Sequence, residues 1–323
     1  MNYDIFNGDA DGIIALIQLR LAEPKESVLI TGVKRDIKLL AQLVDQNDVS
    51  SVTALDISME KNQQPLAALL EQGVEVFYCD HHRTGDIPQS DNLTTLIDLD
   101  AEVCTSLLIN QKLGGQYAKW AVAAAFGDNL FASAEKLAVE IGLSKSDTEF
   151  LKELGTLVNY NGYGASLDDL HIAPADLYKM LLEYPCPLKL RDDKTSPYYT
   201  LKQGYESDYQ NVAALSPISQ SEVATVFELP CEPWARRISG VFGNELANKA
   251  PNTAHGVLTL NASGSDYTVS VRAPLNNRVG ADEVCSSFPT GGGRKAAAGI
   301  NQLPVDSKAA FIEALEGYYG GGR

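Results

Sequence analysis

The chain has 323 residues, 45% of them hydrophobic and 21% charged, which is typical of a soluble globular protein with room for two domains. Acidic residues outnumber basic ones by 42 to 26, for a formal net charge of −16, so the chain lacks the basic excess that binds a long nucleic acid. This balance favours a small phosphate-bearing substrate.

Membrane insertion and cysteine chemistry are not expected. The apolar runs are too short to span a bilayer, and the start Met1-Asn2-Tyr3-Asp4 has no signal-peptide features, which predicts a cytoplasmic protein without a membrane partner. The five cysteines show no Cys-x-x-Cys spacing, which argues against a disulfide framework and against a structural zinc site.

The first half of the chain alternates strand-like and helix-like runs. Strands are expected at residues 3–6, 28–31, 52–55, 74–78 and 93–97. Helices are expected at residues 13–22, 37–44, 65–71, 103–112, 117–126, 132–141 and 146–154. This alternation predicts an α/β domain, with a doubly wound, mainly parallel sheet and helices on both of its faces.

The sequence predicts three segments. Residues 1–185 form the α/β domain, residues 186–234 form a connector rich in turn signals, and residues 235–323 form a second, smaller α+β domain. The expected elements of this second domain are a helix at 235–248, a hairpin of 256–260 with 267–272, a helix near 279–288, a triple glycine and a closing helix at 307–316.

Acidic motifs follow three of the predicted strands, and a further one follows an apolar segment. They are Asp9 and Asp11 after residues 3–6, Asp56 after 52–55, Asp80-His81-His82 after 74–78, and Asp128 after an Ala-rich segment. Because the carboxyl ends of parallel strands meet at one edge of a sheet, we expect these side chains to converge there.

Carboxylates with an imidazole suit a divalent ion such as manganese or magnesium better than zinc. Two such ions can activate a water molecule and neutralise a phosphate, and Asp56 is the candidate for a shared ligand. An isolated Asp-x-Asp-Gly is usually a turn or a helix cap, so the hypothesis depends on the whole set and on the adjacent histidines.

In this order and spacing, Asp9-Ala10-Asp11-Gly12, Asp56, Asp80-His81-His82 and Asp128 resemble the DHH phosphoesterase superfamily, in particular its nanoRNase (oligoribonuclease-like) and RecJ-related members. The run from Gly291 to Gly299 resembles the triple-glycine signature of the DHH-associated C-terminal domain, and Ser270-Val271-Arg272 resembles the strand that precedes it. The resemblance covers both ends of the chain and leaves the middle unmatched.

The resemblance implies a metal ligand set for two manganese ions, with magnesium as a substitute. Asp9 would bind the first ion and Asp11 the second, and Asp56 would bridge the two. His81 and Asp128 would complete the second site.

It also implies catalytic and substrate-binding residues. Asp80 would be an outer or a direct partner of the metal site that orients the histidine, and His82 would face the phosphate and stabilise developing charge. The far end of the substrate would be bound by Arg272, Gly291, Gly292, Gly293 and Arg294.

The chain departs from the family pattern at three positions. Asn7 stands where RecJ-type exonucleases carry a third acid, and Ile5 where nanoRNase-type members carry a histidine. The first metal is therefore expected to bind more weakly, or to be completed by Asn7 and water. Arg294 replaces the usual histidine after the glycines, and its permanent charge favours a terminal phosphate or carboxylate.

The leading hypothesis is a manganese-dependent phosphodiesterase or exonuclease that hydrolyses short oligonucleotides or small nucleotides to mononucleotides. Residues 160–164, Tyr-Asn-Gly-Tyr-Gly, are a candidate platform for stacking a nucleobase, with a purely structural turn as the alternative. The other functions are a phosphoanhydride hydrolase acting on polyphosphate or pyrophosphate, and a non-catalytic nucleotide-binding protein. The sequence leaves a homodimer open.

Overall fold

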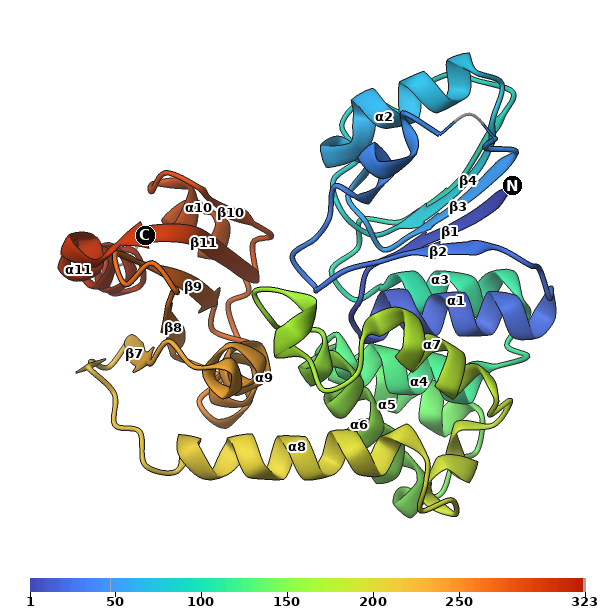
Figure 1. The fold of residues 1–323 in the computed structure, drawn as a ribbon. Helices are drawn as coiled ribbons and strands as arrows, with labels where there is room; N and C mark the ends of the chain where they lie inside the picture. The colour runs from blue at the N-terminus through green and yellow to red at the C-terminus, as the bar shows by residue number, and fades with distance from the viewer. Residues whose placement is uncertain (47, 322–323) are drawn as a thin grey trace. The chain divides into compact units, whose positions relative to one another are not determined.

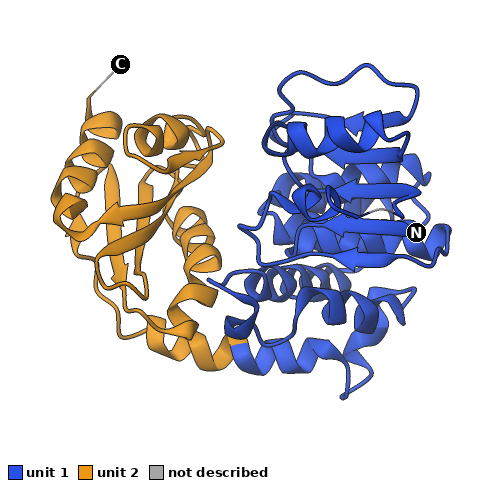
Figure 2. Cartoon of the chain, turned by 45° about the horizontal axis from the view of Figure 1, so that its top comes forward, with its two compact units in different colours: residues 1–204 blue, residues 205–323 orange. Residues whose placement is uncertain are grey.

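The computed structural model describes residues 1–46 and 48–321. Its contacts divide the chain into two compact units, residues 1–204 and 205–323 (Figure 2). The boundary falls inside helix α8 (Pro197–Val212), within the predicted connector, and the last two residues of the predicted segment 235–323 lie outside the described part. In the described ranges no helix is long and apolar enough to cross a bilayer.

The first unit is built on a parallel sheet of five strands in the order β2-β1-β3-β4-β5, which confirms the predicted parallel sheet. The strands are β1 (Asn2–Phe6), β2 (Val28–Ile30), β3 (Ser51–Leu55), β4 (Glu75–Asp80) and β5 (Leu93–Ile97). Phe6 pairs with Leu55 and Leu55 with Cys79, so β1, β3 and β4 end in line at one edge of the sheet.

Helices cover both faces of this sheet, as predicted (Figure 1). On one face lie α1 (Ala10–Ala22) and α3 (Thr105–Lys112), and on the other α2 (Met59–Glu71) with the short 3-10 helix η1 (Leu39–Leu43). Helix α1 is buried almost all round because α3, α4 and α7 pack against it as well as the sheet. The apolar side chains from Ile13 to Ile17 are therefore buried on every face of the helix.

Further helices complete the first unit. They are α4 (Ala118–Gly127), α5 (Phe131–Glu140), α6 (Lys145–Asn161), η2 (Leu167–Asp169), α7 (Pro174–Leu182) and η3 (Pro187–Arg191). Helices α4 and α6 approach closely through glycines: a Cβ added to Gly155 would lie 1.9 Å from the carbonyl oxygen of Ala123. This contact fixes the C-terminal end of α4, where Asp128 follows.

Two expectations for the first unit were wrong in detail, and one helix was not predicted. The predicted helix at 65–71 begins at Met59, with Pro65 inside it rather than at its start. Residues 37–44 contain a 3-10 helix instead of an α-helix. Helix α7 was not predicted, because Pro174 was not recognised as a helix N1 position.

The second unit contains a mixed sheet of six strands in the order β10-β11-β9-β8-β7-β6. The strands are β6 (Ser219–Gln220), β7 (Ala224–Leu229), β8 (Ala254–Leu260), β9 (Asp266–Arg272), β10 (Gly291–Gly293) and β11 (Ala297–Pro304). Strands β7 and β8 are parallel and are joined through α9 (Pro233–Lys249), whereas the other neighbours are antiparallel. The predicted α+β class and the β8–β9 hairpin are confirmed.

The remaining helices of this unit are α10 (Ala281–Ser286), the 3-10 turn η4 (Val305–Ser307) and α11 (Lys308–Gly320). Phe311 and Leu315 of α11 and Val284 of α10 form one core with the sheet strands. The predicted connector proved more regular than expected, because it contains α8 and β7. The Ser196-Pro197 turn signal marks the start of α8, since proline fits the first turn of a helix.

We expect Gly155→Ala to destabilise the protein by about 1–3 kcal/mol, because the added methyl group collides with the Ala123 carbonyl. The measurement is urea denaturation followed by far-UV circular dichroism. Gly317→Ala is the control: it lies in α11 and an added Cβ there meets no described atom within 4 Å. That change should be neutral or stabilise by up to about 1 kcal/mol, and equal transition midpoints for the two variants would contradict the close α4–α6 packing.

Candidate metal centre

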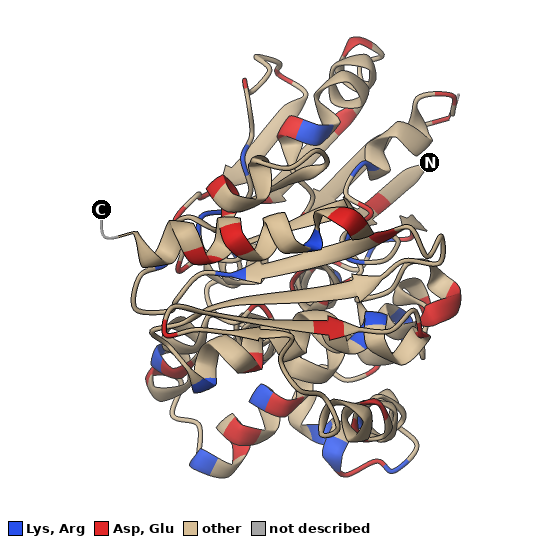
Figure 3. Ribbon diagram, turned by 90° about the vertical axis from the view of Figure 1, so that its left-hand side faces the viewer, with Lys and Arg blue, Asp and Glu red and all other residues tan. Residues whose placement is uncertain are grey.

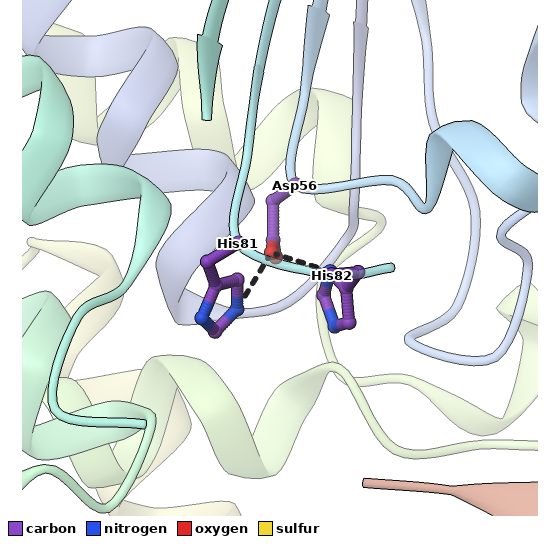
Figure 4. Close-up of side chains that lie close together, drawn as sticks. All are labelled: Asp56, His81 and His82. Carbon is purple, nitrogen blue, oxygen red and sulfur yellow. Dashed lines mark ion pairs between the residues drawn. The ribbon is translucent and has the colours of Figure 1, made fainter. Parts of the chain in front are cut away.

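The ends of β3 and β4 bring an aspartate and two histidines together (Figure 4). Asp56 Oδ1 lies 3.4 Å from Nε2 of His81 and 3.7 Å from Nδ1 of His82. Among the described residues these three form a group whose potential ligand atoms all lie within 4.8 Å of one another. The predicted convergence at the carboxyl edge of the sheet is therefore present in the fold.

The protonation of His81 is set by the backbone. Its Nδ1 lies 2.7 Å from the carbonyl oxygen of Val103, which can only accept, so Nδ1 carries the proton. Nε2 then faces Asp56, with Asp11 Oδ2 at 3.8 Å and Asp128 Oδ2 at 3.9 Å. With Nδ1 donating to Val103, Nε2 is the ring nitrogen that can bind a cation together with these carboxylate oxygens.

Asp11 joins the site to the start of α3. Its two carboxylate oxygens accept the backbone N–H groups of Thr105 and Ser106, each at 2.7 Å. These N–H groups belong to the positive end of the helix and partly compensate the buried charge. Burial nevertheless raises the pKa of Asp11, with nearby Asp128 and Asp9 acting in the same direction.

Asp9 caps the helix that follows it. Its Oδ1 accepts the N–H groups of Asp11 at 3.0 Å and Gly12 at 3.1 Å, and its Oδ2 is paired with the ammonium group of Lys34. Burial alone would raise the pKa of Asp9, but Lys34 and these N–H groups outweigh it and lower the pKa to about 2. Gly12 is required here, because a Cβ would lie 2.3 Å from the Asn7 carbonyl oxygen.

Asp56 is the most strongly perturbed member of the site. It is 2% exposed and adopts a left-handed backbone conformation with φ of 57°, which is uncommon outside glycine. Burial raises its pKa well above the usual range, and the charges of Asp9 and Asp11 raise it further. A buried carboxylate in such surroundings gains most from a bound cation.

Asp80 and His82 form a pair beside this group. Nδ1 of His82 donates to Asp80 Oδ1 at 2.7 Å, whereas the sequence led us to expect Asp80 to orient the metal-binding histidine. Asp80 is fully buried and its Oδ2 has no hydrogen-bond partner within the described ranges. The side chain of His82 is 28% exposed, so its ring is accessible while Asp80 fixes its orientation.

Asp128 ends α4 and reaches the same place. Its Oδ1 lies 3.9 Å from the Lys34 ammonium nitrogen and its Oδ2 lies 3.9 Å from His81 Nε2. Lys34, which follows β2, was missed by sequence reasoning, because an isolated lysine in a loop carries no motif. Its spacing after the second strand of the parallel sheet was the one available signal.

The candidate stacking segment is partly structural. Tyr160 is fully buried, and its hydroxyl group is hydrogen-bonded to Nε2 of His171 at 2.7 Å. Tyr163 is half-buried, with the Lys34 ammonium nitrogen 5.3 Å from its ring centroid. The proposed platform is thereby reduced to Tyr163.

The predicted substrate ligands of the second unit are held by contacts within that unit. The Arg272 guanidinium donates to Asn244 Oδ1 at 2.6 Å and to Ser270 Oγ at 2.8 Å. The three glycines form the edge strand β10, and Gly291 could not carry a Cβ because it would lie 1.8 Å from the Cys285 carbonyl oxygen. Arg294 follows this strand and is exposed. Their role in substrate binding stays a prediction.

No family model and no curated protein matches the chain in sequence. Solved structures do match its fold. RecJ from Thermus thermophilus in complex with Mn²⁺ has a TM-score of 0.67 at 18% identity; the match covers 100% of this chain but 52% of that one. A manganese-bound exonuclease RecJ has a TM-score of 0.63 at 16% identity, with 100% and 90% covered. The pGpG-specific phosphodiesterase PggH from Vibrio cholerae has a TM-score of 0.57 at 11% identity, with 99% of each chain covered.

These likenesses show that the chain shares the fold of those RecJ and phosphodiesterase structures over 99–100% of its length. The resemblance drawn from the four acidic motifs is confirmed at that level. At identities of 18% and below, the roles of individual residues depend on the geometry of this chain rather than on the comparison.

The residues of the site fit a hard or borderline divalent ion. The donors are carboxylate oxygens and a backbone-oriented imidazole, and burial raises the pKa of the neighbouring Cys104 well above its usual value and keeps it a thiol, which favours manganese or magnesium over zinc. The raised pKa of Asp56 and the partnerless Oδ2 of Asp80 are the features that such an ion would relieve.

We expect Asp56→Asn to stabilise the metal-free protein by about 1–2 kcal/mol at pH 7, the usual range for a stabilising substitution. Asparagine tolerates the left-handed backbone and removes a buried charge. The pKa of Asp56 is higher in the folded than in the unfolded protein, so ionised Asp56 lowers the free energy of unfolding. This destabilisation is complete at pH values above the folded-state pKa and disappears as the pH falls toward the unfolded-state pKa.

The test is urea denaturation in the presence of a chelator at several pH values, with the exposed Asp91→Asn as control. The advantage of Asp56→Asn should shrink as the pH falls. If Asp56→Asn destabilises the protein at pH 7, the prediction is wrong, and the charge of Asp56 is already stabilised by its neighbours without a metal.

Proposed function

We propose that the chain is a divalent-metal-dependent phosphodiesterase that hydrolyses short oligonucleotides or small nucleotides to mononucleotides, with manganese as the preferred ion. The observation that carries the proposal is the set of buried carboxylates around Nε2 of His81 at the carboxyl edge of a DHH-type sheet. Buried carboxylates that are not compensated destabilise a fold, so stability alone does not account for this cluster.

Asp56 and His81 are the central ligands of this proposal, with Asp11 and Asp128 beside them. When bound, the metal supplies Lewis-acid activation of water and neutralisation of phosphate charge. The chain supplies the orientation: the Val103 carbonyl holds His81 in one tautomer, and the start of α3 holds Asp11. Ligands fixed in this way lose little freedom when a substrate binds.

His82 is the proposed partner of the reacting phosphate. Asp80 accepts a hydrogen bond from its Nδ1, which leaves Nε2 as the ring nitrogen for the substrate, and the side chain is 28% exposed. A histidine held by a buried carboxylate can donate a proton or stabilise charge at the phosphate through its outer nitrogen. The pair would act much as the Asp–His pairs of hydrolases do, with Asp80 holding the tautomer and His82 meeting the substrate.

The charge of the chain supports a small substrate. In the view of Figure 3, Lys and Arg are interspersed with Asp and Glu along the elements, and the total charge is −16. A long nucleic acid would be repelled by such a surface and bound weakly. A dinucleotide or short oligonucleotide needs few phosphate contacts, and Lys34 with Tyr163 offers one cation and one ring beside the carboxylates.

The experiment is a manganese-supplemented turnover panel of dinucleotides, short oligoribonucleotides, cyclic dinucleotides, 3′-phosphoadenosine 5′-phosphate and polyphosphate. We expect mononucleotide release from one of the first three, lost by at least about 100-fold in His81→Ala because a metal ligand is removed. The control is Asp91→Ala, because Asp91 is exposed and belongs to no motif of the site.

Orthophosphate release from polyphosphate alone would replace the proposal with a phosphoanhydride hydrolase. Nucleotide binding without turnover of any compound would replace it with a binding role.

We expect His82→Gln to lower kcat by about 10²–10⁴-fold, because proton transfer or charge stabilisation at the phosphate is lost. Manganese affinity should change much less than in His81→Ala. Steady-state kinetics, with manganese binding measured by calorimetry, separates the two effects. A loss of manganese binding equal to that of His81→Ala would make His82 a metal ligand instead, as its place 3.7 Å from Asp56 also permits.

A further inference from the structure

Lys34 places an ammonium group among the carboxylates. It is paired with Asp9 and lies 3.0 Å from Asn159 Oδ1 and 3.9 Å from Asp128 Oδ1. The ring of Tyr163 covers it at 5.3 Å, and the side chain is 27% exposed. An ammonium ion bound by two carboxylates and an amide oxygen has the surroundings of a coordinated cation.

The backbone holds Lys34 in this position from two sides. Its N–H donates to the Gly162 carbonyl oxygen at 2.8 Å, and its own carbonyl accepts from the Asn7 amide at 3.1 Å. Gly162 comes so close that an added Cβ would lie 3.0 Å from the Cα of Asp9. Contacts with the end of α6 and with the loop after β1 therefore fix the position of Lys34 beside Asp9.

The groups on this side of the site are largely engaged by Lys34. Asn7 is buried and uncharged; its side-chain nitrogen donates to the Lys34 carbonyl oxygen, and its Oδ1 has no hydrogen-bond partner among the described residues. Asp9 already serves Lys34 with one oxygen and caps α1 with the other. On the other side, the potential ligand atoms of Asp56, His81 and His82 all lie within 4.8 Å of one another.

Building on the proposed metal dependence, we propose that Lys34 takes the place of one metal ion, so that the chain binds a single divalent ion at Asp56 and His81 and uses the Lys34 ammonium as its second positive charge. This replaces the two-ion site predicted from the sequence. A divalent ion on the Asp9 carboxylate would lie close to the Lys34 ammonium and be repelled by it, so we expect Lys34 to weaken metal binding at Asp9. The side chain of Lys34 is 27% exposed, and Asp9 and Asn159 accept two of the three N–H donors of its ammonium group, so the third can donate to a phosphate oxygen.

The first test is the manganese stoichiometry of the whole chain. Protein stripped with a chelator is titrated with Mn²⁺ by calorimetry, and bound metal is counted after gel filtration. We expect about one tight ion per chain, with the electron paramagnetic resonance spectrum of an isolated ion. About two tight ions per chain, or a spectrum of two coupled ions, would overturn the inference while leaving the proposed phosphodiesterase intact.

The second test removes the competing cation. Lys34→Met keeps a long side chain without the charge, and Lys189→Met is the matched control, because Lys189 is 73% exposed in η3. We expect Lys34→Met to gain a second, weaker Mn²⁺ ion and a coupled spectrum, and Lys189→Met to keep the wild-type count. A folded Lys34→Met protein with the wild-type count and spectrum would contradict the inference.

The third test does not depend on the lysine variant folding. Asp9→Asn should retain the single tight ion, because Asp9 pairs with Lys34 and not with the metal. Loss of that ion in Asp9→Asn would overturn the assignment. One tight ion without turnover of any nucleotide would support the inference and sink the proposed function, whereas no bound ion would sink both.

Discussion

The packing of carboxylates against one another at the end of a buried sheet is the constraint on which the first unit depends. Asp9, Asp11, Asp56 and Asp80 are each at most 3% exposed, and desolvation penalises the charged form of every one of them. The surrounding elements supply local compensation: the N-termini of α1 and α3, the imidazoles of His81 and His82, and the ammonium of Lys34. The charge of Asp56 is the least compensated, since its pKa is raised well above the usual value, so a cation from solution would stabilise the site most at Asp56.

The same residues serve the fold and the site. Asp9 is a helix cap in the ordinary sense, and Asp11 holds the first N–H groups of α3, a helix more than ninety positions away in the chain. The structural reading of Asp-x-Asp-Gly and the functional one therefore do not exclude each other. A cap that is also a ligand is rigid, and rigidity is what a preorganised charged site requires.

The carboxylate of Asp9 is neutralised by Lys34, whereas that of Asp56 is not paired with a lysine or arginine in any described ion pair. An ammonium ion is a permanent part of the chain and stays with Asp9, whereas a metal at Asp56 depends on its concentration in solution. In the second unit, the glycine edge of the sheet and Arg272 are held by contacts within that unit. Substrate charge would then be balanced by one fixed cation and one exchangeable cation.

The sequence by itself determined the class of the fold, the strand ends and the acidic motifs. Hydrophobic periodicity sets the strands β1, β3 and β4, and motifs placed directly after them stay at the sheet edge whatever the details of packing. It did not determine Lys34, the Val103 carbonyl that fixes His81, or the pairing of Asp80 with His82. Those contacts join positions from different elements or depend on side-chain direction, and no local periodicity encodes them. Only the tertiary structure decided them, because the close approach of α6 and the β2 loop to Asp9 is a matter of packing between distant segments.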